Sequence, residues 1–220
     1  MLVAVEMGAV LERYGTARAV ETRHGFTVHI YDMGGYSLYV MHSGAGEIAA
    51  AAAAALLIDR YEVELLVNFG VVGGLTPEMA QTKTCVVERV VHYDFDTSAY
   101  DGTLPGQYAE YPDVYIPATA SLVERAVQIA PELRRVTCAS ADKFVEGPEA
   151  KRALHEQFGA DICEMEAAAV VLTCNRSGVP CLLIKTVSDG LMGGAEEFGA
   201  ALARTSALCL EIADAIIREL

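Results

Sequence analysis

The stretch that most constrains the fold runs from residue 163 to residue 190, because it combines a helix pattern, a sharp stop and a buried-strand pattern. Small and aliphatic residues from Ala167 to about Cys174 predict a helix, and Gly178-Val179-Pro180 marks its end. The apolar residues 181–184 then predict a buried strand. A helix that leads directly into a buried strand is typical of an α/β fold.

Carboxylates stand at both ends of this stretch. Glu164 and Glu166 precede the predicted helix, and Asp189 follows the predicted strand. Ligands of parallel α/β sheets bind at the carboxyl ends of strands, so Glu166 and Asp189 are a candidate acid/base pair if the fold brings them together. The plain structural alternatives are a glutamate that favours the helix dipole and a Ser-Asp-Gly turn.

The rest of the chain continues the alternation of strands and helices. The patterns predict strands at 1–5, 26–32, 36–41, 64–69, 85–91 and 135–139, and helices at 9–14, 47–60, 121–129, 149–158 and 196–219. We therefore expect an α/β fold, a three-layer α/β/α sandwich with a central mixed sheet, formed by a single domain over residues 1–220.

Two segments between these elements are candidate functional loops. Gly70 to Gly74 predicts a tight turn or a close approach of the backbone to another group, and it lacks the spacing of a nucleotide-binding fingerprint. Residues 92–115 are polar and rich in tyrosine, and a loop of that length favours a functional or interface role.

Composition excludes several classes of function. A formal net charge of −14 argues against nucleic acid as a partner and against anionic membrane surfaces. No apolar run reaches the roughly 18 residues of a membrane span, and the start of the chain lacks a basic signal-peptide region, so we expect a cytoplasmic protein. The six cysteines are scattered without metal-site spacing, so neither a metal nor a cofactor is expected.

Six short segments occur in the order found in the purine nucleoside phosphorylase and nucleosidase superfamily, and the chain most closely resembles its 5′-methylthioadenosine/S-adenosylhomocysteine nucleosidases. The segments are Ser43-Gly44-Ala45-Gly46, Asn68 to Gly74, His92 to Asp96, Ser140 to Val145, Glu164-Met165-Glu166 and Ser188-Asp189. The resemblance covers nearly the whole length. It implies hydrolysis of the N-glycosidic bond of an adenine nucleoside, with release of adenine, in methionine salvage.

The resemblance also implies roles for individual residues. Met165 would pack under the ribose, and Glu166 would accept hydrogen bonds from its hydroxyls. Asp189 would be the general acid that protonates purine N7, with Ser188 holding it in place.

Further residues would line the base and the 5′ end of the substrate. Phe144 would stack on the base and Val145 would offer it backbone hydrogen bonds, and Gly70, Val71 and Lys185 would also contact the substrate. Members of the family are homodimers or larger homo-oligomers. In the dimers the aromatic loop reaches the neighbouring site, which would place Tyr100 near the 5′ substituent.

The chemistry of the reaction fits these residue types. Breaking the N-glycosidic bond leaves an oxocarbenium-like sugar and an electron-rich purine, so the leaving group needs an acid that still holds a proton near neutrality. An aspartic acid can donate to N7 and accept from a 6-amino group. A carboxylate on the sugar hydroxyls stabilises the positive ring more strongly in the transition state than before it.

Three positions depart from the family pattern. The water-activating glutamate that follows the first strand aligns with Gly8, and Glu6 or Glu12 could replace it only if the local path of the chain differs. The serine often found in the glycine segment is Val71, and an arginine that usually precedes Ser-Asp is Lys185.

These departures leave two alternatives to hydrolysis. A phosphorylase needs no water-activating base, but it needs cations around the phosphate, and the glycine segment contains none. A purine-nucleoside binding protein that has lost turnover would also explain the glycine at position 8. The preferred 5′ substituent, which could be methylthio, homocysteinyl, deoxy or hydroxyl, is left open.

Overall fold

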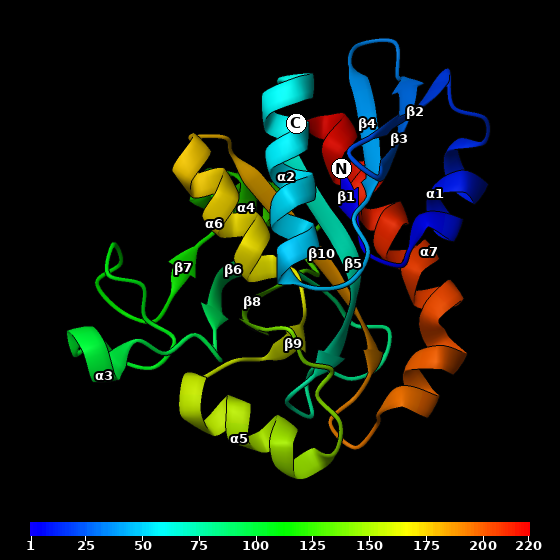
Figure 1. Cartoon of the computed structure of the whole chain (residues 1–220). Helices are drawn as coiled ribbons and strands as arrows, with labels where there is room; N and C mark the ends of the chain where they lie inside the picture. The colour runs from blue at the N-terminus through cyan, green and yellow to red at the C-terminus, as the bar shows by residue number, and fades with distance from the viewer.

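The computed structural model describes residues 1–220, whose strands join into one mixed sheet (Figure 1). The strands are β1 (Leu2–Val3), β2 (Ala19–Arg23), β3 (Phe26–Asp32), β4 (Ser37–His42), β5 (Leu66–Gly74), β6 (Thr84–His92), β7 (Ile116–Pro117), β8 (Arg134–Ser140), β9 (Ile162–Glu164) and β10 (Cys181–Asp189). The helices are α1 (Met7–Tyr14), α2 (Glu47–Tyr61), α3 (Ser98–Asp101), α4 (Ala120–Ile129), α5 (Pro148–Phe158), α6 (Ala167–Ser177) and α7 (Ala195–Glu219). The α/β class and the central mixed sheet are confirmed.

The sheet closes on itself at one end. Its order is β10-β6-β8-β9-β5-β1-β4-β3-β2, and β10 also pairs with β5, so five strands form a ring. Strand β10 runs parallel to β5 and antiparallel to β6. Because β10 is paired on both edges, it lies in the middle of the sheet and all its residues are buried.

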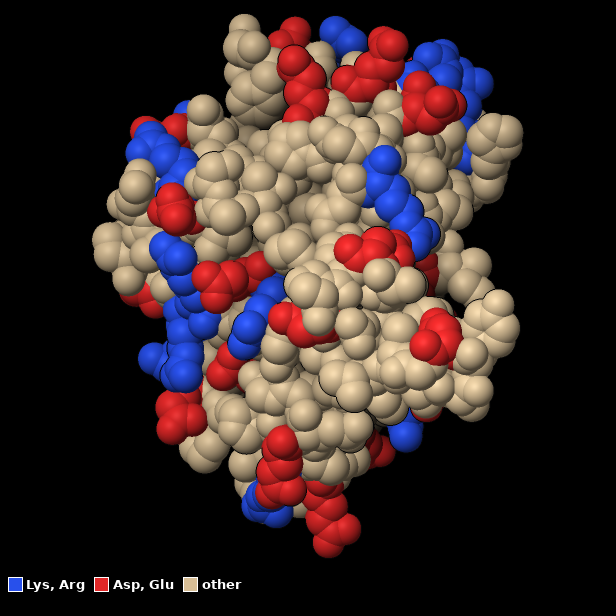
Figure 2. All heavy atoms as spheres, turned by 90° about the vertical axis from the view of Figure 1, so that its left-hand side faces the viewer, with Lys and Arg blue, Asp and Glu red and all other residues tan.

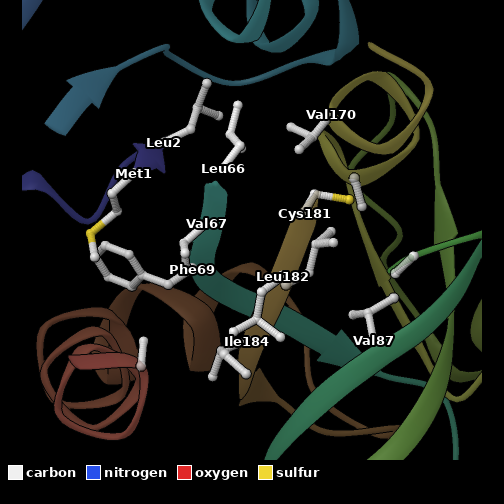
Figure 3. Close-up of a cluster of buried hydrophobic side chains, with 14 of the residues drawn as sticks. Met1, Leu2, Leu66, Val67, Phe69, Val87, Val170, Cys181, Leu182 and Ile184 are labelled. Atoms are coloured by element: carbon white, nitrogen blue, oxygen red, sulfur yellow. The ribbon is translucent and has the colours of Figure 1, made fainter. Parts of the chain in front are cut away.

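Helices cover this sheet and complete the core. Helix α7 packs on β5 and β10, while α2 and α6 pack against each other, where the small alanines of α2 allow close approach (Figure 1). One cluster of 48 buried residues runs from the first strand to the last helix, so both ends of the chain share a core. Figure 3 shows part of it: Phe69 of β5 lies beside Met1, and Val87 of β6 lies on the far side of Leu182 of β10.

Several elements differ from the sequence-based predictions. The strand predicted at residues 1–5 ends at Val3, because the chain then bends and the N–H groups of Ala4 and Val5 donate to the Glu6 carboxylate. The strand predicted at 181–184 continues to Asp189 because it has hydrogen-bonding partners on both sides. The short strands β2, β7 and β9 and the single turn α3 carry too little pattern to be predicted.

The glycine segment from Gly70 to Gly74 is not a turn, so that alternative was wrong. It continues β5 as extended strand, and none of its glycines has a positive φ. Close approach explains the glycines instead. A Cβ at Gly70 would stand 2.7 Å from Glu6 Oε1, and one at Gly74 would clash with the carbonyl of Met79. No helix combines the length and apolar character that crossing a membrane requires.

Candidate active site

A pocket opens where β1, β5, β9 and β10 end, and it gathers most of the predicted site residues. Those that line it are Val71, Phe144, Val145, Met165, Glu166 and Asp189. Glu6, Lys143, Cys163, Glu164 and Phe198 also line it. The helix start and the strand end of residues 163–190 therefore meet at one cavity, as the candidate acid/base pair requires.

The other four predicted residues lie outside this lining. Ser188 lies directly behind Asp189, with its Oγ 2.9 Å from Asp189 Oδ1. Gly70 lies directly against the Glu6 carboxylate. The buried Lys185 donates to Glu164 Oε2 at 3.0 Å. Tyr100 lies on α3 and is 92% exposed, so within one chain it contacts nothing in the pocket.

Glu166 is held at the junction of two helices. It precedes the first residue of α6, and its Oε1 accepts a hydrogen bond of 2.9 Å from the N–H of Gly46, the residue before α2. Burial and the nearby charge of Glu164 raise the pKa of Glu166 to about 7. This carboxyl therefore changes charge close to neutral pH, and its ionised form is an acceptor for hydroxyl groups.

Glu164 is the ionised member of the carboxylate cluster behind Glu166. Burial alone would raise its pKa, but the ammonium of Lys185 and the hydroxyl of Ser140 lower it below the usual value. The N–H groups of Glu166 and Ala167 also donate to this carboxylate. A charge with this many donors is stable inside the protein.

Glu47, at the start of α2, is the neutral member of the same cluster. Burial, followed by the charge of Glu164, raises its pKa to about 8. Ser140 Oγ lies 2.5 Å from Glu47 Oε1 and 2.6 Å from Glu164 Oε1. Because one hydroxyl proton cannot serve both oxygens, a proton on Glu47 completes the two short hydrogen bonds.

Asp189 ends β10 and faces a different set of partners. Its Oδ2 accepts a hydrogen bond of 2.7 Å from Nζ of Lys151, a residue of α5 that is 0% exposed. The same ammonium donates to the carbonyl of Gly190 at 2.7 Å. Asp189 is thus a buried carboxylate paired with a buried cation.

Glu6 enters the pocket because the chain bends after β1. Its Oε2 accepts hydrogen bonds from the N–H groups of Ala4 and Val5, and its Oε1 accepts one of 2.9 Å from Val71. Gly8 and Glu12 are both exposed and do not line the pocket. Of the three positions weighed for a water-activating carboxylate, only Glu6 lies in the pocket.

Two aromatic side chains form part of the opposite wall. Phe144 and Phe198 meet edge to face, with ring centroids 5.6 Å apart and ring planes at 80°. Phe198 comes from α7, which is far away in the sequence, and Phe144 remains 41% exposed at the mouth. A flat aromatic base can stack on such a wall.

Lys151, Glu47 and Phe198 were missed by sequence reasoning. Only Lys151 carried a signal: it falls on the same helix stripe as Leu154 and Phe158, at i, i+3 and i+7, and all three are buried. A lysine on an apolar stripe is a candidate for a buried charge. Glu47 and Phe198 have no such pattern around them.

Comparisons with known proteins agree with the resemblance. A family model described as the phosphorylase superfamily matches residues 3–218. The chain is 34% identical over 163 residues to the 5′-methylthioadenosine/S-adenosylhomocysteine nucleosidase of Shewanella baltica, which covers 71% of this chain and 68% of that protein.

Two solved structures from Helicobacter pylori match the whole chain. A 5′-methylthioadenosine/S-adenosylhomocysteine nucleosidase in complex with an aminopyrrolopyrimidine ligand has a TM-score of 0.93 and 27% identity, and the match covers 100% of this chain and 97% of that one. The native futalosine hydrolase has a TM-score of 0.93 and 27% identity, with 100% and 96% covered. The protein described here belongs to the phosphorylase superfamily.

Proposed function

We propose that this protein hydrolyses the N-glycosidic bond of an adenine nucleoside of the 5′-methylthioadenosine or S-adenosylhomocysteine type and releases adenine. The observation that carries the proposal is the meeting of Glu166, Asp189 and Glu6 in one pocket. The names of the relatives, nucleosidases that act on these compounds, support the substrate class.

Each of the three carboxyl groups takes one part of the reaction. Asp189 delivers a proton to purine N7 as the C1′–N9 bond breaks, so the purine leaves as a neutral molecule. Glu166 accepts hydrogen bonds from the ribose hydroxyls and, with Met165 under the ring, stabilises the positive charge that develops on the sugar. Glu6 removes a proton from the water that attacks C1′.

The position of Glu6 favours hydrolysis over phosphorolysis. Its carboxylate accepts the hydrogen bond of the Val71 N–H, a donor in the glycine segment that a phosphate would otherwise use. The wall holds four carboxyl groups against one cation, Lys143, and no arginine; the four are Glu6, Glu164, Glu166 and Asp189. An anionic nucleophile would be repelled from such a surface, whereas water would not.

We propose that the active form is a homodimer or a larger homo-oligomer. Tyr100 and Leu104, in the segment that includes α3, are 92% and 60% exposed. Figure 2 looks onto the side of the molecule where α3 stands, and uncharged atoms cover much of the middle of that face. A second copy would bury these side chains and receive Tyr100 near the 5′ substituent of its substrate.

The remaining proposals concern the setting of the site. The shared core and the helix packing support a single domain arranged as a three-layer α/β/α sandwich. A role in methionine salvage in the cytoplasm follows from the proposed substrate class. The futalosine hydrolase among the structural matches makes futalosine the second nucleoside to assay.

The proposal is tested by incubating the purified protein with 5′-methylthioadenosine, S-adenosylhomocysteine and futalosine, and by following base release chromatographically with and without phosphate. We expect adenine release from at least one of the first two substrates without phosphate. Release that depends on phosphate would assign a phosphorylase, and nucleoside that stays bound and uncleaved would assign a binding protein.

A further inference from the structure

Lys151 is the one buried cation bonded to the proposed general acid. Its Nζ donates to Asp189 Oδ2 at 2.7 Å, to the Gly190 carbonyl at 2.7 Å and to the Gly193 carbonyl at 3.2 Å. An ammonium group has three hydrogens, so this side chain is satisfied in its charged form. Burying such a charge is unfavourable, and an apolar residue would suit the stripe that it shares with Leu154 and Phe158.

This pair raises a chemical question about the source of the proton. A general acid must hold a proton when purine N7 becomes basic, yet an ammonium group beside a carboxyl favours the ionised carboxylate. Ser188 Oγ lies 2.9 Å from Asp189 Oδ1 and 3.1 Å from the carbonyl oxygen of Val72, so its single proton cannot serve both oxygens. The proton that Lys151 Nζ donates to Asp189 Oδ2 lies directly beside the proposed acid and is a source for the proton that the purine needs.

We propose that Lys151 supplies, through Asp189, the proton that the purine receives; this inference rests on the proposed function. As the C1′–N9 bond breaks, its electron pair moves into the purine ring. Lys151 Nζ gives a proton to the Asp189 carboxylate and becomes a neutral amine, and Asp189 gives a proton to N7, so that Asp189 is a carboxylate again when the base leaves. The amine regains a proton from solvent after the base leaves, and Glu6 returns the proton of the attacking water to solvent.

Other charged or titratable groups near the pair do not replace either member. Cys163 of β9 is close to both, and burial raises the pKa of its thiol to about 12, so it remains neutral. Glu197 of α7 is bonded to the N–H of Gly190, and Glu164 is bonded to Lys185. Asp189 is thus the only carboxylate that accepts a hydrogen bond from Lys151.

Two substitutions separate proton supply from simple positioning. Lys151→Met removes the cation, so the buried Asp189 has to take its own proton from solvent. Lys151→Arg keeps the cation and the ion pair, but an arginine does not release its proton. Thermal unfolding and circular dichroism establish that each variant folds.

The measurement is the turnover number between pH 5.5 and 9.5 for wild type and both variants. We expect Lys151→Arg to lose at least about 10²-fold across the whole range. We expect Lys151→Met to approach wild-type turnover at the acidic end and to fall by about tenfold per pH unit toward the alkaline end, where wild type remains active. Near-wild-type turnover of Lys151→Arg, or a Lys151→Met profile parallel to wild type, would overturn the relay.

Infrared spectroscopy gives a readout independent of turnover. At pH 6 the protonated Glu47 and Glu166 already give carboxyl bands in wild type. Lys151→Met should show one further protonated carboxyl band, which disappears in Lys151→Met/Asp189→Asn. A protonated carboxyl band of wild type that disappears in Asp189→Asn would overturn the inference even if one Lys151 variant failed to fold. A wild type that cleaves no nucleoside would overturn the proposed function itself, whereas adenine release with unshifted variant profiles would overturn the relay alone.

Discussion

Two buried lysines, each paired with a carboxylate, back different parts of the pocket. Lys185 donates to Glu164 at 3.0 Å on the side of Glu166, and Lys151 donates to Asp189 at 2.7 Å on the other. Three carboxyl groups surround the single cation Lys185, because Glu47 and Glu166 both lie close to its partner Glu164. Around Lys151 one carboxylate meets one cation.

This difference in charge balance gives the Lys185 side and the Lys151 side of the pocket different protonation behaviour. Burial, together with the neighbouring charge of Glu164, raises the pKa of Glu47 to about 8 and of Glu166 to about 7, so these groups bind protons near neutrality. At Lys151 one carboxylate accepts from one ammonium group, and in the proposed relay this pair passes on a proton only when the purine becomes basic. Protonation of the sugar side should therefore depend on pH, whereas the base side should depend on the partner of Asp189.

The largest effect should come from replacing Asp189, the proposed general acid on the side of the pocket that faces the purine. Asp189→Asn cannot pass on a proton, so turnover should fall by at least about 10²-fold with the fold intact. The comparison is steady-state adenine release by wild type, Asp189→Asn and the remote control Asp32→Asn, which changes an exposed hairpin residue. Near-wild-type turnover of Asp189→Asn would contradict the assignment of Asp189 as the general acid.

The next effect tests the sugar side through Glu166. The ionised form binds the ribose hydroxyls, so kcat/KM of wild type should rise by about tenfold per pH unit and level off near pH 7, where the raised pKa lies. Glu166→Gln should lower kcat/KM by at least about 10²-fold and abolish this acidic limb. If the acidic fall in kcat/KM persists in Glu166→Gln, it arises from the titration of another group.

Glu47 gives a smaller effect, on stability. Its pKa is about 8 in the folded protein and near 4.5 in an ordinary environment, so between these values the folded state holds a proton that the unfolded state lacks. This group therefore stabilises the fold most at low pH, and that contribution is lost as pH rises to 8. Relative to Glu47→Gln, wild type should lose on the order of a few kcal/mol of unfolding free energy from pH 5 to pH 8. The unfolding free energy is measured by urea denaturation at each pH. If it varies with pH in the same way in wild type and Glu47→Gln, the assignment of Glu47 as a buried, protonated carboxyl is contradicted.

The smallest effect concerns the aromatic wall. Phe198→Ala removes the edge-to-face partner of Phe144, a contact of about 0.5–1.5 kcal/mol, so KM should rise by about 2- to 10-fold. The turnover number should change little, because neither ring handles a proton. A large loss of turnover with unchanged KM would place Phe198 in the chemistry instead.

The sequence predicts the parts of the site that are local in the chain. Glu166 and Asp189 were located because a helix start and a strand end have recognisable patterns, and Phe144 and Val145 because they lie in a short motif. Glu6 depends on a bend after β1 that the apolar pattern of residues 1–5 hides. The role of Gly70 to Gly74 could not be assigned, since glycine serves tight turns and close approaches equally well. The neighbours that decide it, Glu6 at Gly70 and the Met79 carbonyl at Gly74, are known only from the structure.

The most direct test of hydrolysis at this site is adenine release from 5′-methylthioadenosine by wild type and Glu6→Gln, without phosphate and then with it. We expect wild type to release adenine in both conditions and Glu6→Gln to fall by at least about 10²-fold in both, because the amide cannot take the proton of water. Wild-type turnover in Glu6→Gln, or activity in either protein only when phosphate is added, would contradict this account.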